Sequence, residues 1–145
     1  MYLVDVIKKH MAYPELERTI KRTINKYSPH ETLIEEKASG ITLIQNLRTD
    51  YKYRRGLIPI NPKGESKVIR MENETSAIES GVVYIPEYAD WLVDFEDECI
   101  AFPNGTHDDQ VDAMSMYLKR RRMKNSHKTD DVKLESLTSL SIWSK

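Results

Sequence analysis

The order in which strand-like and helix-like patterns follow one another constrains the fold of this chain most. Apolar runs rich in Ile, Leu and Val at 2–7, 32–36 and 57–60 have the length of β-strands. Between them, residues 14–27 and 40–47 repeat apolar side chains every three or four positions, which is typical of amphipathic helices. Strands that alternate with helices predict an α/β fold, in which helices flank a mixed sheet.

The second half of the chain extends this pattern. A strand is predicted over 81–85, and the helix after it carries Trp91, Phe95 and Cys99 on its apolar face. Thr106 is predicted to open a last helix that continues through Leu118. Because 145 residues suit one ordinary domain, we expect a domain over 1–124 and a flexible polar tail over 125–145.

Several classes of protein do not fit this composition. No apolar run approaches the roughly 20 residues of a membrane-spanning helix, and the N-terminus does not read as a secretory signal. Cys99 has no second cysteine for a disulfide or a thiolate zinc site, which suits a reducing compartment. The Gly-rich phosphate loop of ATPases is not found, nor is a serine or thiol nucleophile motif.

The net charge of −1 conceals a segregation of charge along the chain. Residues 86–118 contain nine acidic side chains and no Lys or Arg, and a basic run follows at 119–124. Like charges packed this closely repel one another. The acidic block therefore indicates either a solvated face or a site that recruits cations.

Two acidic clusters occupy positions that suit a ligand site. Glu35 and Glu36 end an apolar strand, and the carboxyl ends of strands in α/β sheets are where ligands usually bind. Alternation along the strand places the two side chains on opposite faces. At most one of them points naturally into a given pocket.

The second cluster is Asp108, Asp109 and Asp112, spaced to crowd one side of a helix start. Together with a strand-end Glu, such acids can hold two divalent metals about 4 Å apart for phosphodiester cleavage. A structural alternative stays open. Thr106 with Asp109 fits a capping box, and acids in the first turn complement the helix dipole.

Basic residues form further groups that suit a nucleic-acid backbone. The run at 119–124 either contacts phosphate or neutralises a helix end. Lys67 and Arg70 lie one helical turn apart. Tyr51 and Tyr53 alternate with cations in a second, weaker patch, whose basic members are Arg48, Lys52, Arg54 and Arg55.

The ordered set of segments resembles the C-terminal nuclease domain of tailed-phage terminase large subunits. The similar segments are 33–47, 67–70, 81–86 with 91–92, and 102–113, the last reading Phe-Pro-Asn-Gly-Thr-His-Asp-Asp-Gln-Val-Asp-Ala. The resemblance runs in order over about residues 2–118. It implies an RNase H-like fold and an endonuclease that cuts concatemeric phage DNA during packaging with two Mg²⁺ or Mn²⁺ ions.

The resemblance also implies roles for individual residues. Glu35, Asp108 and Asp109 correspond to the catalytic metal ligands. Glu36, His107 and Asp112 correspond to supporting positions, although the sequence favours His107 as a polar residue at a helix start over a ligand. The resemblance implies DNA contact for Lys67 and Arg70. The density of the basic run, and not the resemblance, makes Lys119, Arg120, Arg121 and Arg122 candidates for phosphate contact.

Members of the family carry a further strand with a catalytic Asp ahead of the segment that resembles 2–7, and an ATPase motor before it. We therefore expect an N-terminally truncated domain whose first strand is missing, and Asp5 does not replace that Asp. The exposed sheet edge left behind predicts self-association. Double-stranded DNA, the terminase small subunit, the portal and a separate motor domain are the implied partners, in the cytoplasm of a bacterial host.

Three alternatives stay open at this point. The first is an inactive prophage remnant that binds DNA without cutting it. The second is another RNase H-like nuclease, of the resolvase or transposase kind. The third is a purely structural or protein-interaction module.

Overall fold

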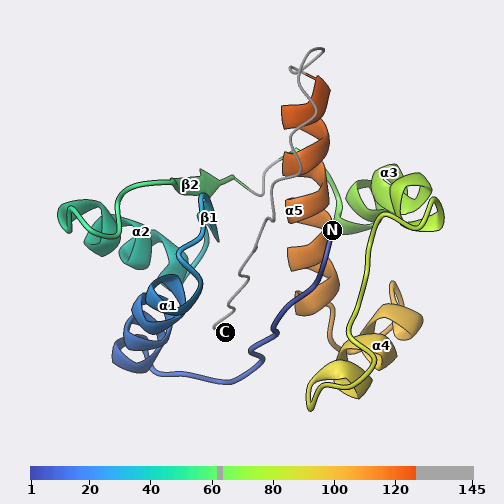
Figure 1. Ribbon diagram of the computed structural model, residues 1–145, viewed down its shortest axis with the longest axis horizontal. Coiled ribbons are helices and arrows are strands. Elements are labelled where there is room, and N and C mark those ends of the chain that lie inside the picture. The colour runs from blue at the N-terminus through green and yellow to red at the C-terminus, as the bar shows by residue number, and fades with distance from the viewer. Residues whose placement is uncertain (62–63, 127–145) are drawn as a thin grey trace. The chain divides into compact units, whose positions relative to one another are not determined.

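The computed structural model describes residues 1–61 and 64–126 (Figure 1). The described chain divides into two compact units. We call residues 5–61 with Gly64 the strand unit, and residues 1–4 with 65–126 the helical unit. In the described part of the chain, no helix is long and apolar enough to cross a membrane.

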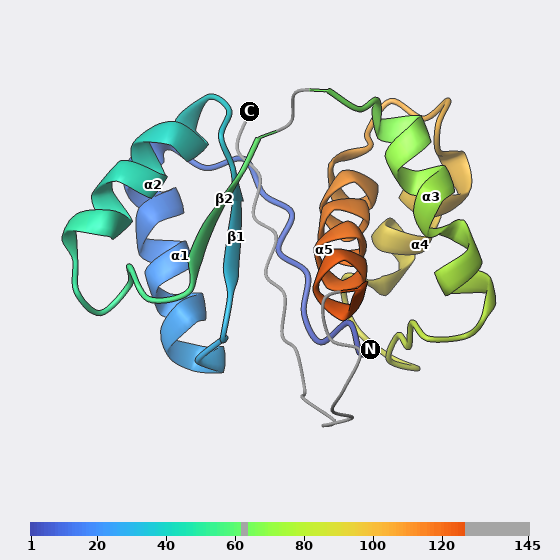
Figure 2. The ribbon, with the colours of Figure 1, turned by 90° about the horizontal axis from the view of Figure 1, so that it is seen from above.

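The strand unit contains the alternation that the sequence predicts. Its elements are α1 (Tyr13–Tyr27), β1 (Thr32–Glu35), α2 (Ser39–Thr49) and β2 (Leu57–Ile60). The two strands pair in parallel, with Thr32 opposite Leu57 and Glu35 opposite Ile60. Parallel neighbours need a crossover connection, and α2 supplies it. Both helices lie on the same side of the strand pair (Figures 1 and 2).

The core of the strand unit lies between the strands and these two helices. Leu16 and Ile20 of α1 meet Leu43, Ile44 and Leu47 of α2, and Ile34 completes the buried cluster from β1. The apolar spacing of α1 and α2 therefore serves one core. Gly56 begins the return into β2 with a φ of 73°, and a Cβ there would collide with the backbone carbonyl of His30.

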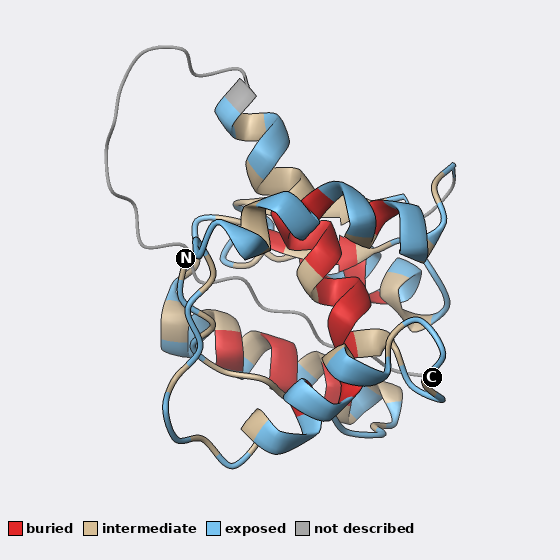
Figure 3. Cartoon of the chain, turned by 90° about the vertical axis from the view of Figure 1, so that its right-hand side faces the viewer, coloured by how far each residue is buried: buried red, intermediate tan, exposed pale blue. Residues whose placement is uncertain are grey.

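The helical unit is built on one long helix. Its elements are α3 (Lys67–Glu79), α4 (Leu92–Ala101) and α5 (Asp109–Ser126), and both α3 and α4 pack against α5. Val111, Ala113 and Leu118 are among the buried residues of α5, and Phe95 is buried on α4. Figure 3 colours the buried positions of the chain red.

Several sequence predictions are changed by the structure. The segments 2–7 and 81–85 form only an isolated bridge between Tyr2 and Tyr84, whose rings stack 4.9 Å apart. In the described residues no neighbouring strand extends that pairing into a ladder. The sequence also gave no expectation of a helix over 67–79, where Ser66 caps the first turn by accepting the Ile69 N–H.

The predicted fold class is confirmed, because helices and a parallel strand pair form a mixed α/β chain consistent with an RNase H-like fold. Residues 125 and 126 belong to α5. The rest of the predicted tail, 127–145, lies outside the described residues, and the domain boundary at 124 stays a prediction.

Candidate functional site

A buried ion pair joins α3 to α5 in the helical unit. The guanidinium of Arg70 contacts the carboxylate of Asp112, and these side chains are 7% and 3% exposed. The Nε of Arg70 also donates to Ser115 Oγ at 3.0 Å, and Ser115 Oγ donates to the backbone oxygen of Asp112 at 2.8 Å. Each buried charge is therefore satisfied by a partner, as low-dielectric surroundings require.

Lys67 lies one turn before Arg70 and reaches the start of the same helix. Its Nζ donates to Asp108 Oδ1 at 2.8 Å and lies 3.4 Å from Asp112 Oδ2. Two cations of α3 thus face Asp112 of α5 and Asp108, the residue before its first turn. This pairing offsets the repulsion that three crowded carboxylates would otherwise create.

Asp109, the first residue of α5, is the member of the acidic cluster that keeps its charge uncompensated. Within the described residues, no cation or hydrogen-bond donor reaches its half-buried carboxylate. The helix dipole favours a negative charge at this end. Asp109 therefore combines a stabilised charge with a free pair of carboxylate oxygens.

Glu98 of α4 is a structural residue of this region that the sequence analysis missed. Its Oε1 accepts the Gln110 N–H at 2.5 Å and the Val111 N–H at 3.3 Å, and its Oε2 accepts Gln110 Nε2 at 2.7 Å. These amides belong to the first turn of α5 and have no partner inside the helix. The spacing of Glu98 from Trp91 and Phe95 places it on the apolar face of α4, a signal that could have revealed it.

The pKa of the neighbouring Cys99 is shifted by burial and by nearby acids. Burial, followed by the charges of Glu98 and Glu96, raises the pKa of the Cys99 thiol to about 11. The thiol is therefore protonated at neutral pH, which does not suit a nucleophile or a metal ligand.

The capping box predicted for Thr106 and Asp109 is wrong. The last helix begins at Asp109 rather than at Thr106, and both Thr106 and His107 are exposed. The backbone oxygen of Asp108 accepts the Asp112 N–H at 2.8 Å, so Asp108 is the residue at the helix cap. The side chain of Glu98 performs the capping that the sequence assigned to Thr106.

Glu35 ends β1 in the strand unit, at the carboxyl edge of the parallel pair. Its side chain is half-buried, like that of Leu33 on the same face of the strand. Glu36 follows the end of the strand and is exposed, although alternation alone would place it with the buried Ile34. No cation or donor among the described residues contacts either carboxylate. The backbone of Glu36 continues the pairing by donating to the Ile60 oxygen at 2.8 Å.

The turn after Glu35 is held tightly. A Cβ on Gly40 would collide with the backbone oxygen of Glu35, and Ala38 adopts a φ of 46° in this turn. Such a backbone conformation is costly for a residue with a Cβ. The close approach of α2 to the end of β1 fixes the backbone from which Glu35 projects.

The structure therefore brings together some predicted site residues and not others. Lys67, Arg70, Asp108 and Asp112 form one connected group in the helical unit, with Asp109 beside it. Glu35 and Glu36 belong to the strand unit. Across residues 1–61 and 64–126, no group of three His, Cys, Asp or Glu side chains is placed to hold a metal ion. A metal role for Glu35, Asp108 and Asp109 stays a prediction.

The structure revises part of the predicted DNA contact. Arg70 is buried and paired, so it is not available to a phosphate group in this arrangement. Lys119 donates to Glu65 at 2.5 Å, and this hydrogen bond lowers the pKa of Glu65. Arg122 donates to the buried Glu74 at 2.9 Å. These three cations hold α5 to the rest of its unit, while Arg120 and Arg121 lie half-exposed on α5.

Parallel strands joined by a crossover helix, with a carboxylate at the strand end, are consistent with the class of RNase H-like proteins. The chain matches the family described as terminase RNaseH-like domain over residues 1–121, and it belongs to this family. Searches among curated proteins and among solved structures returned no match. Membership confirms the family resemblance and supports a terminase nuclease-type function.

Proposed function

We propose that this chain is a metal-dependent endonuclease domain that cuts concatemeric viral DNA during packaging. The observation that carries the proposal is the selective pairing of the acids. Asp112 is neutralised by Arg70 and Lys67, whereas Asp109 and Glu35 have no cationic partner in the described part of the chain. Carboxylate oxygens that no protein cation neutralises are available to bind a metal cation.

The donor set fits a hard divalent cation. Carboxylate oxygens are the ligands that Mg²⁺ and Mn²⁺ prefer, and one or two protein carboxylates suffice for Mg²⁺. In this proposal the metal ligands are Asp108 and Asp109 of the helical unit and Glu35 of the strand unit. When bound, a pair of such ions supplies an activated water and stabilises the leaving oxygen of the phosphodiester.

The other residues of the network position these ligands. Arg70 fixes Asp112 and thereby the first turns of α5, on which Asp109 sits. The Glu98 carboxylate on α4 accepts the backbone N–H groups of Gln110 and Val111 in the same turn. Lys67 holds the Asp108 carboxylate and lies close enough to the acids to contact a phosphate oxygen of bound DNA.

A plasmid-cleavage assay tests the proposal. Wild type incubated with Mn²⁺ should nick and linearise supercoiled plasmid, and Asp109→Ala should lose this activity by at least about a hundredfold, since a metal ligand is removed. Asp97→Ala removes an exposed acid of α4 in the same unit and should cut like wild type. Equal cutting by wild type and Asp109→Ala would attribute the activity to a contaminant and contradict the proposal.

A second candidate function is DNA binding without cleavage. The contact that favours it is the ion pair of Lys67 with Asp108, which neutralises one of the proposed ligands. DNA binding that weakens with salt, together with no calorimetric signal for Mn²⁺, would favour this function over the nuclease.

A further inference from the structure

A basic loop, which we define as residues 48–55, begins in the last turn of α2 and continues past its end in the strand unit. It holds Arg48, Lys52, Arg54 and Arg55 against one acid, Asp50. All four cations are exposed, and no described residue forms an ion pair with any of them. The Asp50 carboxylate instead accepts the backbone N–H of Lys52 at 2.9 Å and so shapes the turn.

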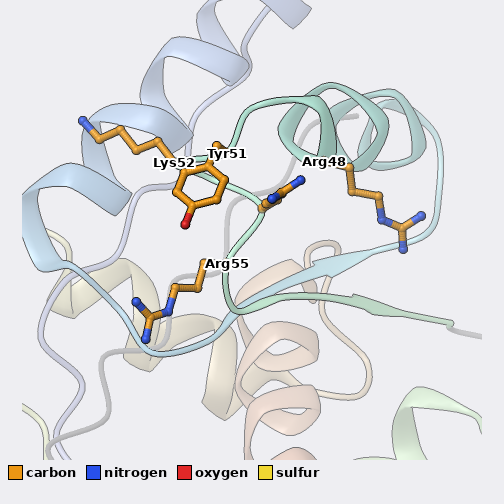
Figure 4. Close-up of a pocket in the computed structure, with 5 residues that line it drawn as sticks. Arg48, Tyr51, Lys52 and Arg55 are labelled. Atoms are coloured by element: carbon orange, nitrogen blue, oxygen red, sulfur yellow. The ribbon is translucent and has the colours of Figure 1, made fainter.

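The same cations surround a pocket of about 600 Å³ (Figure 4). Tyr51 stands among them and is 80% exposed, one of the most exposed aromatic rings of the described chain. The Arg54 guanidinium lies 4.7 Å from the centre of the Tyr51 ring, and Lys52 Nζ lies 5.5 Å from the centre of the Tyr53 ring. These cation–π contacts orient two of the cations but do not neutralise their charge.

Four like charges around one pocket repel one another unless an anion is present. Guanidinium groups bind phosphate through paired N–H donors, and an exposed ring beside them offers a face for base stacking. A small anion would satisfy one or two of the cations, whereas a phosphodiester chain presents successive charges to all of them. We infer that this pocket binds the phosphodiester backbone of DNA.

This inference rests on the proposed function in taking DNA as the ligand, but its residues are separate from Glu35, Asp108 and Asp109. The site lies wholly within the strand unit. Binding here needs no divalent metal. The inference therefore predicts DNA affinity that survives chelation of divalent metals.

Fluorescence anisotropy of the full chain with labelled 20-nucleotide single-stranded and 20-base-pair duplex DNA in EDTA tests the inference. The double variant R54Q/R55Q should bind about tenfold more weakly than wild type at 100 mM salt, with a salt dependence reduced by about two ion equivalents. The matched variant R18Q/R22Q removes two exposed cations from α1 of the same unit and should bind like wild type.

Tyr51→Ala identifies the form of DNA. If Tyr51→Ala lowers the affinity at least about fivefold for single-stranded DNA only, the pocket binds unpaired DNA. If the substitution changes the affinity for both DNA forms equally, the pocket contacts the backbone alone. Both results support the inference provided that R54Q/R55Q binds weakly. Because the substituted side chains are exposed, thermal unfolding of the variants should match wild type. A folded R54Q/R55Q variant that binds both DNA forms as tightly as R18Q/R22Q would overturn the inference.

Discussion

At the scale of single residues, the pairing of Arg70 with Asp112 explains why an acidic cluster can lie on a buried helix face. The carboxylate of Asp112 is removed from water, and the charges of Arg70 and Lys67 compensate it. Such a pair adds little net stability relative to apolar residues, yet breaking it leaves an uncompensated buried charge. Arg70 and Asp112 therefore act as a structural unit beside the proposed ligand Asp109.

This pair gives a prediction for stability. Arg70→Met should lower the free energy of unfolding by about 3–5 kcal/mol, because the Asp112 charge stays buried without its main partner. The double variant Arg70→Met with Asp112→Leu should recover most of that loss. Urea unfolding measures both, with Arg121→Met as a control on a half-exposed cation of α5. A loss below about 1 kcal/mol for Arg70→Met would show that the buried pair does not hold α3 to α5.

At the scale of elements, α5 depends on a cap supplied by another helix. Glu98→Ala should destabilise the protein by about 1–3 kcal/mol, because the amides of Gln110 and Val111 lose their acceptor. The matched variant Asp97→Ala removes a neighbouring exposed acid and should change the free energy of unfolding by less than about 0.5 kcal/mol. Equal urea midpoints for the two variants would refute the capping role.

Some of the helices and strands could be predicted from sequence patterns, and others could not. The helices and strands between residues 13 and 60 are predictable because their apolar spacing reflects one shared core. The segments 2–7 and 81–85 have strand-like patterns, but a pattern cannot state whether a partner strand is available, and only Tyr2 and Tyr84 pair. Tertiary pairing, not local propensity, decides the length of a strand.

The candidate site is predictable in composition and less so in arrangement. Glu35, Asp108 and Asp109 stand out from the sequence because acids end an apolar strand and open a helix. The roles of Arg70 and Glu98 depend on partners 42 and 12 residues away, which no local spacing reveals. From the sequence, a basic residue near acids is interpreted as a DNA contact. In the structure Arg70 is buried and pairs with Asp112, so its role is structural.

At the scale of the whole molecule, each unit carries one part of the proposed chemistry. The strand unit contributes Glu35 and the basic loop, and the helical unit contributes Asp108 and Asp109 on a helix start stabilised by ion pairs and a cap. Membership of the terminase RNase H-like family supports a nuclease-type function for the chain. The central claim is that the unpaired carboxylates hold a divalent metal.

Calorimetric titration of the full chain with Mn²⁺ tests that claim most directly, because it measures metal binding without requiring DNA or cleavage. Wild type should bind Mn²⁺, and Glu35→Gln and Asp109→Asn should each weaken binding at least about tenfold, since each removes a charged oxygen ligand. Asp97→Asn should bind like wild type. Unchanged Mn²⁺ affinity in both ligand variants, or no binding by wild type, would contradict the claim.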